Sequence, residues 1–279
     1  MNSVELTYPD SIGELLQDYQ PCDASMELVS KGDEFLRNHD LDGAEQSYCR
    51  ALETFEGNWD ALAGLEYVES LRKPESVRFN WGENAVTREH LDRRHHNAVL
   101  NESEFEQGRR KLKSQPKMSL VELTTRCNFD CFHCSRTYFH CQEVDMTPEL
   151  LSRIEQEVLP LVAFVTVTGF GEQTISKSYP RLMSSLVKQD IIPHFSTNTS
   201  TLNAQHIAAL VRYDANVILS VDGTSRSTFE KIRHGGRWQK LVNSLFLIRR
   251  IRSVHKGTGK FRITFVAMRM NIHELPDMI

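Results

Sequence analysis

Three cysteines lie within eight residues of this chain, in the run VELTTRCNFDCFHC at residues 121–134. They are Cys127, Cys131 and Cys134, and an apolar, strand-like stretch leads straight into their CxxxCxxC loop. Three thiolates on one short loop can hold three irons of a [4Fe–4S] cube and leave the fourth iron without a protein ligand. A cluster that only carries electrons is normally closed by four cysteines, so this spacing predicts an iron that is open to chemistry.

Two other uses of cysteine have to be weighed against this one. Disulfides are disfavoured because residues 1–6 do not have the charged, apolar and small-residue order of a signal peptide. Zinc stays open because a fourth ligand is available nearby, from Cys141, His133 or His140. Cys22 and Cys49 are far from the loop, and we expect both to be buried as small hydrophobic residues.

The composition is that of an ordinary globular protein, with 279 residues, 40% hydrophobic and 25% charged content. The formal net charge of −4 gives no basic field for nucleic acid. No run approaches the roughly 18 to 20 apolar residues that span a bilayer, so we expect no membrane partner. We therefore expect a cytoplasmic protein, in agreement with an oxygen-sensitive cluster.

Residues 1–73 are predicted to be an α-helical region with a repeat. Small and aromatic residues fall where the tetratricopeptide consensus places them, at Gly32, Phe35, Ala44, Tyr48 and Ala51. A second unit starts at Trp59, 34 residues after Ser25, and then fades. Because about three repeats are normally needed for stability, this one and a half must pack on something else. An unrelated helical hairpin is the alternative. Residues 74–115, with charged runs at 93–96 and 109–111, are predicted to be a linker.

Residues 116–279 alternate between apolar runs and amphipathic stretches, which predicts an α/β fold. The five runs expected as strands are 119–124, 162–168, 191–195, 217–221 and 261–268. The stretches expected as helices are 148–158, 178–188, 202–213 and 227–251, and Thr147 followed by Pro148 is a helix start. Helical crossovers between strands imply a parallel sheet, whose ligands lie at the carboxyl ends of the strands.

Polar residues follow four of these strands at that same end. The cysteine loop follows the first strand, and residues 168–173 (TGFGEQ) follow the second. Residues 196–199 (STNT) follow the third, and residues 220–223 (SVDG) end the fourth. The agreement between strands indicates one site at the carboxyl edge of the sheet.

The spacing of the cysteines, with an aromatic residue flanking the third one, resembles that of the radical S-adenosylmethionine (radical SAM) enzymes. The resemblance covers residues 116–279. The resemblance implies a partial (β/α)6 barrel that binds a [4Fe–4S] cluster through Cys127, Cys131 and Cys134. It implies S-adenosylmethionine (SAM) as a second cofactor, cleaved reductively to a 5′-deoxyadenosyl radical that abstracts hydrogen from a substrate. It also implies an external electron donor, such as flavodoxin or ferredoxin.

The resemblance assigns roles to residues after the second, third and fourth strands. The segment Gly169-Phe170-Gly171-Glu172 resembles the family's GGEP segment, in which glycines and a carboxylate bind the methionine amine. Gln173 replaces the usual proline, which we expect to cost loop rigidity. Ser220 and Asp222 are two residues apart at a strand end, so we expect them to point to the same face. They resemble the ribose-binding position, and Asn198 resembles the polar position near ribose or substrate; each could instead be a turn cap.

Two further residues are implied as cofactor contacts. Arg233, in Lys231–Gly236, resembles an arginine that approaches the cofactor carboxylate, although Gly235-Gly236 could simply be a helix break. His133 occupies the place of an aromatic residue that packs near the adenine. No residue is assigned to proton transfer on the substrate.

Residues 266–276 resemble the fifth strand and following loop of the branch that modifies peptides and proteins, related to SPASM enzymes. The resemblance implies a peptide or protein substrate. We find five strands where the family has six, so we expect either a C-terminally truncated chain or a partner that covers the sheet edge. The alternative function is a non-catalytic adaptor that binds proteins through its helical repeats.

Overall fold

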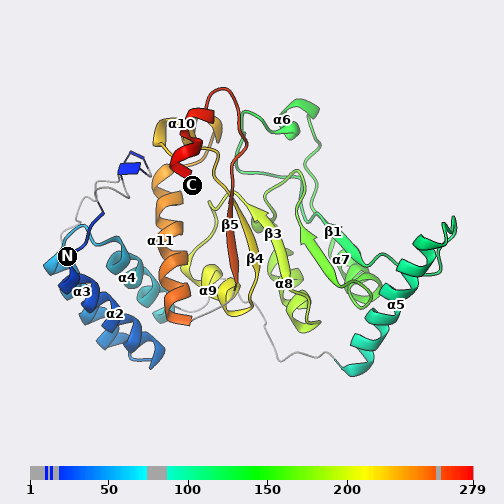
Figure 1. Cartoon of the computed structure of the whole chain (residues 1–279), viewed down its shortest axis with the longest axis horizontal. Coiled ribbons are helices and arrows are strands. Elements are labelled where there is room, and N and C mark those ends of the chain that lie inside the picture. The colour runs from blue at the N-terminus through cyan, green and yellow to red at the C-terminus, as the bar shows by residue number, and fades with distance from the viewer. Residues whose placement is uncertain (1–9, 12, 15–18, 74–86, 256–258, 279) are drawn as a thin grey trace.

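The computed structural model describes residues 10–11, 13–14, 19–73, 87–255 and 259–278. Five parallel strands form one sheet in the order β1-β2-β3-β4-β5, as Figure 1 shows. The strands are β1 (Met118–Val121), β2 (Phe164–Val167), β3 (Pro193–Thr197), β4 (Asn216–Ser220) and β5 (Lys260–Thr264). The predicted α/β architecture with a five-stranded parallel sheet is confirmed.

The two faces of the sheet differ. One face is buried, and its residues Val165, Val167, Phe195, Val217 and Leu219 are at most 1% exposed. This face packs on the helices that follow β1 to β4, which are α7 (Pro148–Arg153) with the π-helical turn η1 (Ile154–Val158), α8 (Tyr179–Lys188), α9 (Ala204–Arg212) and α11 (Trp238–His255).

The opposite face of the sheet is open. Leu120 is 64% exposed, and across the strands it is in register with Thr166, His194, Asn216 and Lys260. In a parallel sheet covered by helices on one side only, this is the concave face of an incomplete barrel.

The helices expected in residues 116–279 form, with one change. Thr147 caps α7 by accepting a hydrogen bond from the Leu150 amide at 3.2 Å, and Pro148 is the first helical residue. The stretch predicted as one helix over 227–251 is two, α10 (Arg226–Ile232) and α11, because the chain breaks at Gly235, where φ is +94°. None of the helices in the described parts of the chain has the length and apolarity needed to cross a membrane.

The N-terminal region is helical as predicted, with α2 (Asp23–Arg37), α3 (Leu41–Thr54) and α4 (Trp59–Arg72). The Tyr48 ring lies where these helices cross. It leaves no space for a side chain on Gly32 or Gly64, because a Cβ would come within 2.5 Å of the ring at Gly32 and within 2.6 Å at Gly64. Small residues therefore let the helices approach around one aromatic side chain, as the consensus positions predicted. The tetratricopeptide identity itself stays a prediction.

These helices pack against α11, on the left of the sheet in Figure 1. Arg250 of α11 lies between two buried carboxylates, 3.0 Å from Asp33 and 3.4 Å from Asp60. Trp59 stacks on Phe246 of the same helix, with ring centroids 5.8 Å apart. The helix α11 therefore packs on these helices in the place where a further repeat would pack in a longer array.

The described part of the predicted linker contains a 19-residue helix, α5 (Arg88–Glu106), on the β1 side of the sheet in Figure 1. Arg94, in the first charged run of the predicted linker, is buried and donates to the Gln189 carbonyl at 3.0 Å. Asn97 is also buried and donates to the Gln115 carbonyl at 3.0 Å. One face of α5 is therefore packed on the core.

Candidate iron–sulfur site

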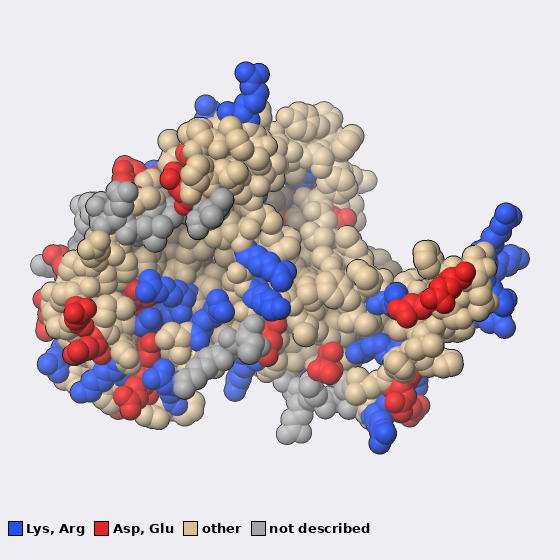
Figure 2. Space-filling model, viewed as in Figure 1, with Lys and Arg blue, Asp and Glu red and all other residues tan. Residues whose placement is uncertain are grey.

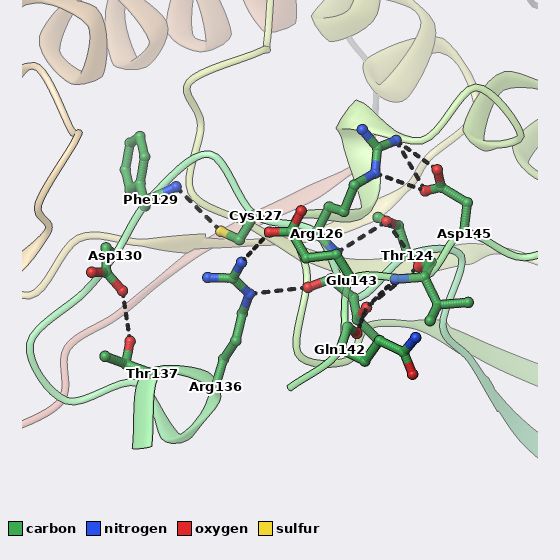
Figure 3. A network of polar contacts seen from close by, with 12 residues as sticks. Thr124, Arg126, Cys127, Phe129, Asp130, Arg136, Thr137, Gln142, Glu143 and Asp145 are labelled. Carbon is green, nitrogen blue, oxygen red and sulfur yellow. Dashed lines mark hydrogen bonds and ion pairs between the residues drawn. The ribbon is translucent and has the colours of Figure 1, made fainter. Parts of the chain in front are cut away.

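The cysteine loop leaves the sheet after β1 and enters the short helix α6 (Ser135–Phe139). Its two ends are joined at the base, as Figure 3 shows around Thr124 and Asp145. The Thr125 amide donates to the Val144 carbonyl at 2.9 Å, and Arg126 is paired with Asp145 at 2.8 Å. Arg136 donates to the Thr125 carbonyl at 3.0 Å. The two ends of the loop are therefore held together by the protein's own contacts.

The far side of the loop is held by the end of α10. The Asp130 amide donates to the His234 carbonyl at 2.9 Å, and the Phe132 amide donates to the Ile232 carbonyl at 2.8 Å. Because the loop backbone is held on both sides, little conformational entropy is lost when the loop binds a ligand.

The three thiols sit in an environment with hydrogen-bond donors. Cys131 is buried, whereas Cys127 and Cys134 are half-buried. The Phe129 amide donates to Cys127 Sγ at 3.4 Å (Figure 3), and Arg233 donates to Cys131 Sγ at 3.8 Å. Burial raises the pKa of Cys127, and it raises the pKa of Cys131 to about 11 although the Arg233 cation opposes the shift. Donors aimed at sulfur favour the thiolate form that iron requires.

Within the described ranges, no three His, Cys, Asp or Glu side chains are grouped closely enough to hold a metal ion. Among the other cysteines, Cys22 is exposed and Cys49 half-buried, so the expectation that both are buried was wrong.

The glycine segment after β2 lies directly on the start of the cysteine loop. A Cβ on Gly171 would come within 2.2 Å of the Thr124 carbonyl oxygen and 2.4 Å of that of Arg126. The amide of Glu172 donates to the same Arg126 carbonyl at 2.9 Å. Gly169 approaches a side chain instead, that of Glu122, which accepts a hydrogen bond from the Phe170 amide. The absence of side chains here permits backbone contact between two loops.

The carboxylate of Glu172 was expected to be available to a ligand, but it is 4% exposed and faces the protein. It accepts hydrogen bonds from the Asn198 amide at 2.7 Å and from the Thr174 hydroxyl at 2.6 Å. Burial raises the pKa of Glu172, and these hydrogen bonds oppose the shift. In this arrangement Glu172 joins the loop after β2 to the loop after β3.

Gln173, at the start of η2 (Gln173–Ile175), is a residue whose role the sequence did not reveal. Its side chain is fully buried, accepts from the Leu123 amide at 2.6 Å and donates to the Gly171 carbonyl at 3.0 Å. A proline has no side-chain donor or acceptor for these bonds. The glutamine therefore ties the glycine segment to the end of β1 and restores the rigidity expected to be lost.

Asn198 is buried beside the cysteine loop. Its side-chain amide donates to the side-chain Oδ1 of Asn128 at 2.9 Å and lies 3.9 Å from Cys127 Sγ. Its own carbonyl oxygen accepts from the Ser200 hydroxyl at 2.6 Å. The structure thus brings the third strand's polar residue to the first cysteine.

Asp222 and Arg233 form a buried ion pair at 2.5 Å, and His133 Nε2 lies 3.3 Å from the same Asp222 oxygen. Ser220 and Asp222 were expected to share a face, but Asp222 has φ +58° and its side chain is fully buried, whereas Ser220 is half-buried at the end of β4. Arg233 Nε and His133 Nδ1 are buried without a hydrogen-bond partner among the described residues. Burial lowers the pKa of His133, and Asp222 opposes this.

The last described turn, η3 (Ile272–Met278), holds the loop after β4, and its residues were not singled out from the sequence. Asn271 donates to the Asp222 carbonyl at 2.9 Å. Glu274 accepts from the Thr224 amide at 2.6 Å and from the Ser225 hydroxyl at 2.6 Å. The sequence does not show this role, because it depends on hydrogen bonds between residues about 50 positions apart in the chain.

The profile of the radical SAM superfamily matches residues 121–275. The probable GTP 3′,8-cyclase of Methanocaldococcus jannaschii is 25% identical over 165 residues, which are 57% of this chain and 52% of that protein. The mycofactocin maturase MftC of Mycobacterium ulcerans is 25% identical over 157 residues, which are 56% of this chain and 41% of that protein. The chain thus spans about half the length of these relatives.

Among solved structures, Streptococcus suis SuiB bound to S-adenosylmethionine aligns with a TM-score of 0.48 and 15% identity. The alignment covers 92% of this chain and 53% of that one.

Proposed function

Because the chain belongs to the radical SAM superfamily, we propose that it is an enzyme that cleaves SAM reductively and abstracts hydrogen from a peptide or protein. Membership of the family implies a [4Fe–4S] cluster and SAM as cofactors. When bound, these cofactors supply the electron transfer and the 5′-deoxyadenosyl radical, and the protein supplies position and exclusion of water. We propose Cys127, Cys131 and Cys134 as the iron ligands.

One observation carries this proposal: the cysteine loop is clamped by its own base and by α10, and groups from three other strands converge on it. These groups are Gly171 after β2, Asn198 after β3, and Arg233, which is paired with the residue after β4. Donors from Asn198 and Arg233 approach two of the three sulfur atoms. A zinc knot would not need polar groups from the whole carboxyl edge of the sheet.

We propose that SAM binds along the same edge. Gly171 lets the loop after β2 pack directly on the start of the cysteine loop, and Glu172 positions that loop from within the protein. We propose that the methionine part of SAM contacts the backbone of this loop. Ser220, half-buried at the end of β4, is placed to contact the ribose. His133 borders the adenine side, held against Asp222.

Arg233, Asp222 and Asn198 support the cluster loop as well as the nucleotide. The Arg233 side chain spans from Asp222 to Cys131, so its cation faces the sulfur from a buried position. Charge close to iron–sulfur ligands affects the potential at which a cluster accepts an electron. Asn198 holds Asn128 and faces Cys127.

A peptide or protein substrate is supported by the open face of the sheet. Leu120 and Phe164 offer apolar surface there, and His194, Asn216 and Arg262 offer hydrogen-bonding groups on the same face. This mixture suits the backbone and side chains of a peptide. We further propose residues 1–73 as a tetratricopeptide-like module, 74–115 as a connector and 116–279 as the catalytic part, working in the cytoplasm.

Anaerobic reconstitution tests the proposal. The protein should bind about four irons per chain, show iron–sulfur absorption, and release 5′-deoxyadenosine from SAM when dithionite is added. Cys127→Ala should lose the cluster and the cleavage. Cys141→Ala is the matched control, because Cys141 is a nearby thiol outside the motif. Loss of metal in Cys141→Ala, or zinc in place of iron, contradicts the proposal.

A further inference from the structure

A closed ring of hydrogen bonds joins three polar side chains beside the first cysteine of the loop. The side-chain amide of Asn128 donates to the Ser200 hydroxyl at 2.8 Å, and this hydroxyl donates to Asn198 Oδ1 at 2.6 Å. The side-chain amide of Asn198 closes the ring by donating to Asn128 Oδ1 at 2.9 Å. None of the cofactor roles proposed above uses Ser200.

The ring fixes which end of the Asn198 side chain faces the cysteine. The backbone amide of Ser200 lies 3.0 Å from Asn198 Oδ1, and since a backbone N–H can only donate, the atom that it meets must be the oxygen. The NH2 group of Asn198 therefore lies on the other side of the amide. One of its two hydrogens is donated to Asn128, and the other is available to Cys127 Sγ, which is 3.9 Å from the nitrogen.

The backbone that carries this amide is held as well. Asn198 is 5% exposed, and its backbone N–H donates to the buried carboxylate of Glu172 at 2.7 Å. Thr199 is buried with a φ of +68°, and its N–H donates to Thr197 Oγ1 at 3.1 Å. A β-branched residue rarely adopts this left-handed conformation, and such strain persists where the surrounding contacts dictate the backbone, commonly at functional sites. The remaining freedom of Asn198 lies in its side-chain torsions, and the ring fixes those.

We propose that Ser200 is a positioning residue that keeps the Asn198 amide turned toward Cys127 and thereby raises the reduction potential of the cluster. The inference rests on the function proposed above, in which Cys127 is an iron ligand. When the cluster takes one electron from an external reductant, the negative charge on its cysteine sulfurs increases. An N–H dipole that points at sulfur stabilises the reduced form more than the oxidised form, and hydrogen bonds to the sulfurs are among the determinants of cluster potential. If the amide turned over, its oxygen would face the sulfur and act in the opposite direction.

The Asn198 amide acts as a neutral dipole at short range. Charged side chains gather on the outer surface, over the N-terminal helices, α5 and the region of α11 and β5, as Figure 2 shows. Exposed charges of this kind are screened by salt, whereas a group that is 5% exposed is screened much less. The effect of Ser200 on the potential should therefore be the same at about 0.05 M and about 1 M salt.

Ser200 is suited to conservative substitution because it lines a hollow. The hollow has a volume of about 330 Å³ and lies between the cysteine loop, the loop after β3 and the junction of α10 with α11. Ser200→Ala removes the hydroxyl, whereas Ser200→Thr keeps it, and the hollow offers space for the added methyl group. Ser185→Ala on α8 is the matched control, because Ser185 is also half-buried and its hydroxyl donates to one side chain, that of Glu155, at 2.6 Å. These changes are between neutral side chains and leave the net charge unaltered.

The experiment measures the midpoint potential of the reconstituted full chain by titration with dithionite, followed by the EPR signal of the reduced cluster. We expect Asn198→Ala and Ser200→Ala each to make reduction about threefold less favourable, which lowers the potential by about 28 mV at 59 mV per tenfold for one electron. The two losses should not add in the Asn198→Ala/Ser200→Ala double variant, because both remove the same N–H···S contact. Ser200→Thr and Ser185→Ala should keep the potential of the unaltered protein.

An unchanged potential in Ser200→Ala overturns the proposal, as do additive losses in the double variant or a lowered potential in Ser200→Thr. If Ser200→Ala binds too little iron to titrate, Asn198→Asp decides. It keeps an oxygen for Ser200 and replaces the donor by a second oxygen, so an unchanged potential in this variant also overturns the proposal.

The ring itself is tested in the iron-free chain. Urea denaturation of the same set of single and double variants should show that the stability losses of Asn198→Ala and Ser200→Ala overlap, because both break the bond between these two side chains. Fully independent losses contradict the ring. Iron content and release of 5′-deoxyadenosine by the unaltered protein test the proposed function separately, so a normal cluster with an unchanged potential in the variants counts against the present inference alone.

Discussion

The two glycines of the segment after β2 look equivalent in the sequence, but the structure predicts opposite responses to alanine. In Gly171→Ala the new Cβ meets two backbone carbonyl oxygens, of Thr124 at 2.2 Å and of Arg126 at 2.4 Å. A tolerable contact needs about 3.0 Å, so the two loops must separate by about 0.8 Å (3.0 − 2.2). Both carbonyls lie on a chain segment that is held by hydrogen bonds and cannot turn away.

The cost of Gly171→Ala follows from this geometry. Overpacking at a rigid position costs about 1–3 kcal/mol. Separation of the loops also weakens the hydrogen bond from the Glu172 amide to the Arg126 carbonyl, worth about 1 kcal/mol. We therefore expect a loss of about 2–4 kcal/mol in the free energy of unfolding. Iron content after reconstitution should fall, because the displaced carbonyl directly precedes Cys127.

Gly169→Ala is the matched comparison. The atoms nearest its Cβ, at 2.1–2.5 Å, all belong to the Glu122 side chain, which can rotate away. The cost is the hydrogen bond from the Phe170 amide, about 1 kcal/mol, and the Glu122→Ala background should remove any further penalty. Gly57→Ala, whose Cβ would come no closer than 3.5 Å to any neighbour, is the neutral reference.

Urea denaturation gives the free energies and iron analysis gives the cluster occupancy of these variants. The reasoning is refuted if Gly171→Ala and Gly169→Ala lose the same stability and the same iron. It is also refuted if Gly171→Ala retains full iron while Gly169→Ala loses it.

Four further predictions follow from buried charge. Arg250→Ala should cost about 3–5 kcal/mol in urea denaturation because it leaves two buried carboxylates unpaired, whereas the exposed neighbour Arg249→Ala should cost under about 1 kcal/mol. Asp222→Asn should speed removal of iron by a chelator, because it leaves a buried guanidinium without its counter-charge. In the iron-free protein, alkylation of Cys131 should be slow at neutral pH and accelerate as pH rises toward its pKa of about 11, since only the thiolate reacts. Burial alone would raise the pKa of Glu274, but its hydrogen bonds lower it. The ionised carboxylate therefore stabilises the folded protein above the ordinary glutamate pKa, and this stabilisation is lost as pH falls through the lowered pKa. The difference in free energy of unfolding between the unaltered protein and Glu274→Gln should shrink on acidification.

The strands and the position of the site were predictable because they depend on patterns local in the chain. Apolar runs such as 217–221 are buried on one face, and β4 forms there at Asn216–Ser220. Polar groups after successive strands meet at one edge because parallel strands share a direction. The cysteine loop is readable for the same reason, since its three thiols are close in the sequence.

The orientation of individual side chains was not predictable, because it depends on contacts between loops. The strand period placed Ser220 and Asp222 on one face, but the left-handed backbone of Asp222 ends that period. Glu172 is buried because the Asn198 amide and Thr174 are there to bond it. Gln173 could be seen only as a missing proline, since the partners that tie it to the segment after β1 lie about 50 residues earlier in the chain.

The packing of the N-terminal helices has a consequence for the cysteine loop. The helix α11 begins beside the hollow at the cysteine loop, and near its other end it carries Arg250, which is held by Asp33 of α2. One continuous helix therefore lies beside the cysteine loop at one end and packs on α2 and α4 along its length. A change that detaches α2 to α4 exposes the buried Phe246 and Arg250 faces of α11. For this reason α2 to α4 belong to the same packed unit as the sheet and its helices.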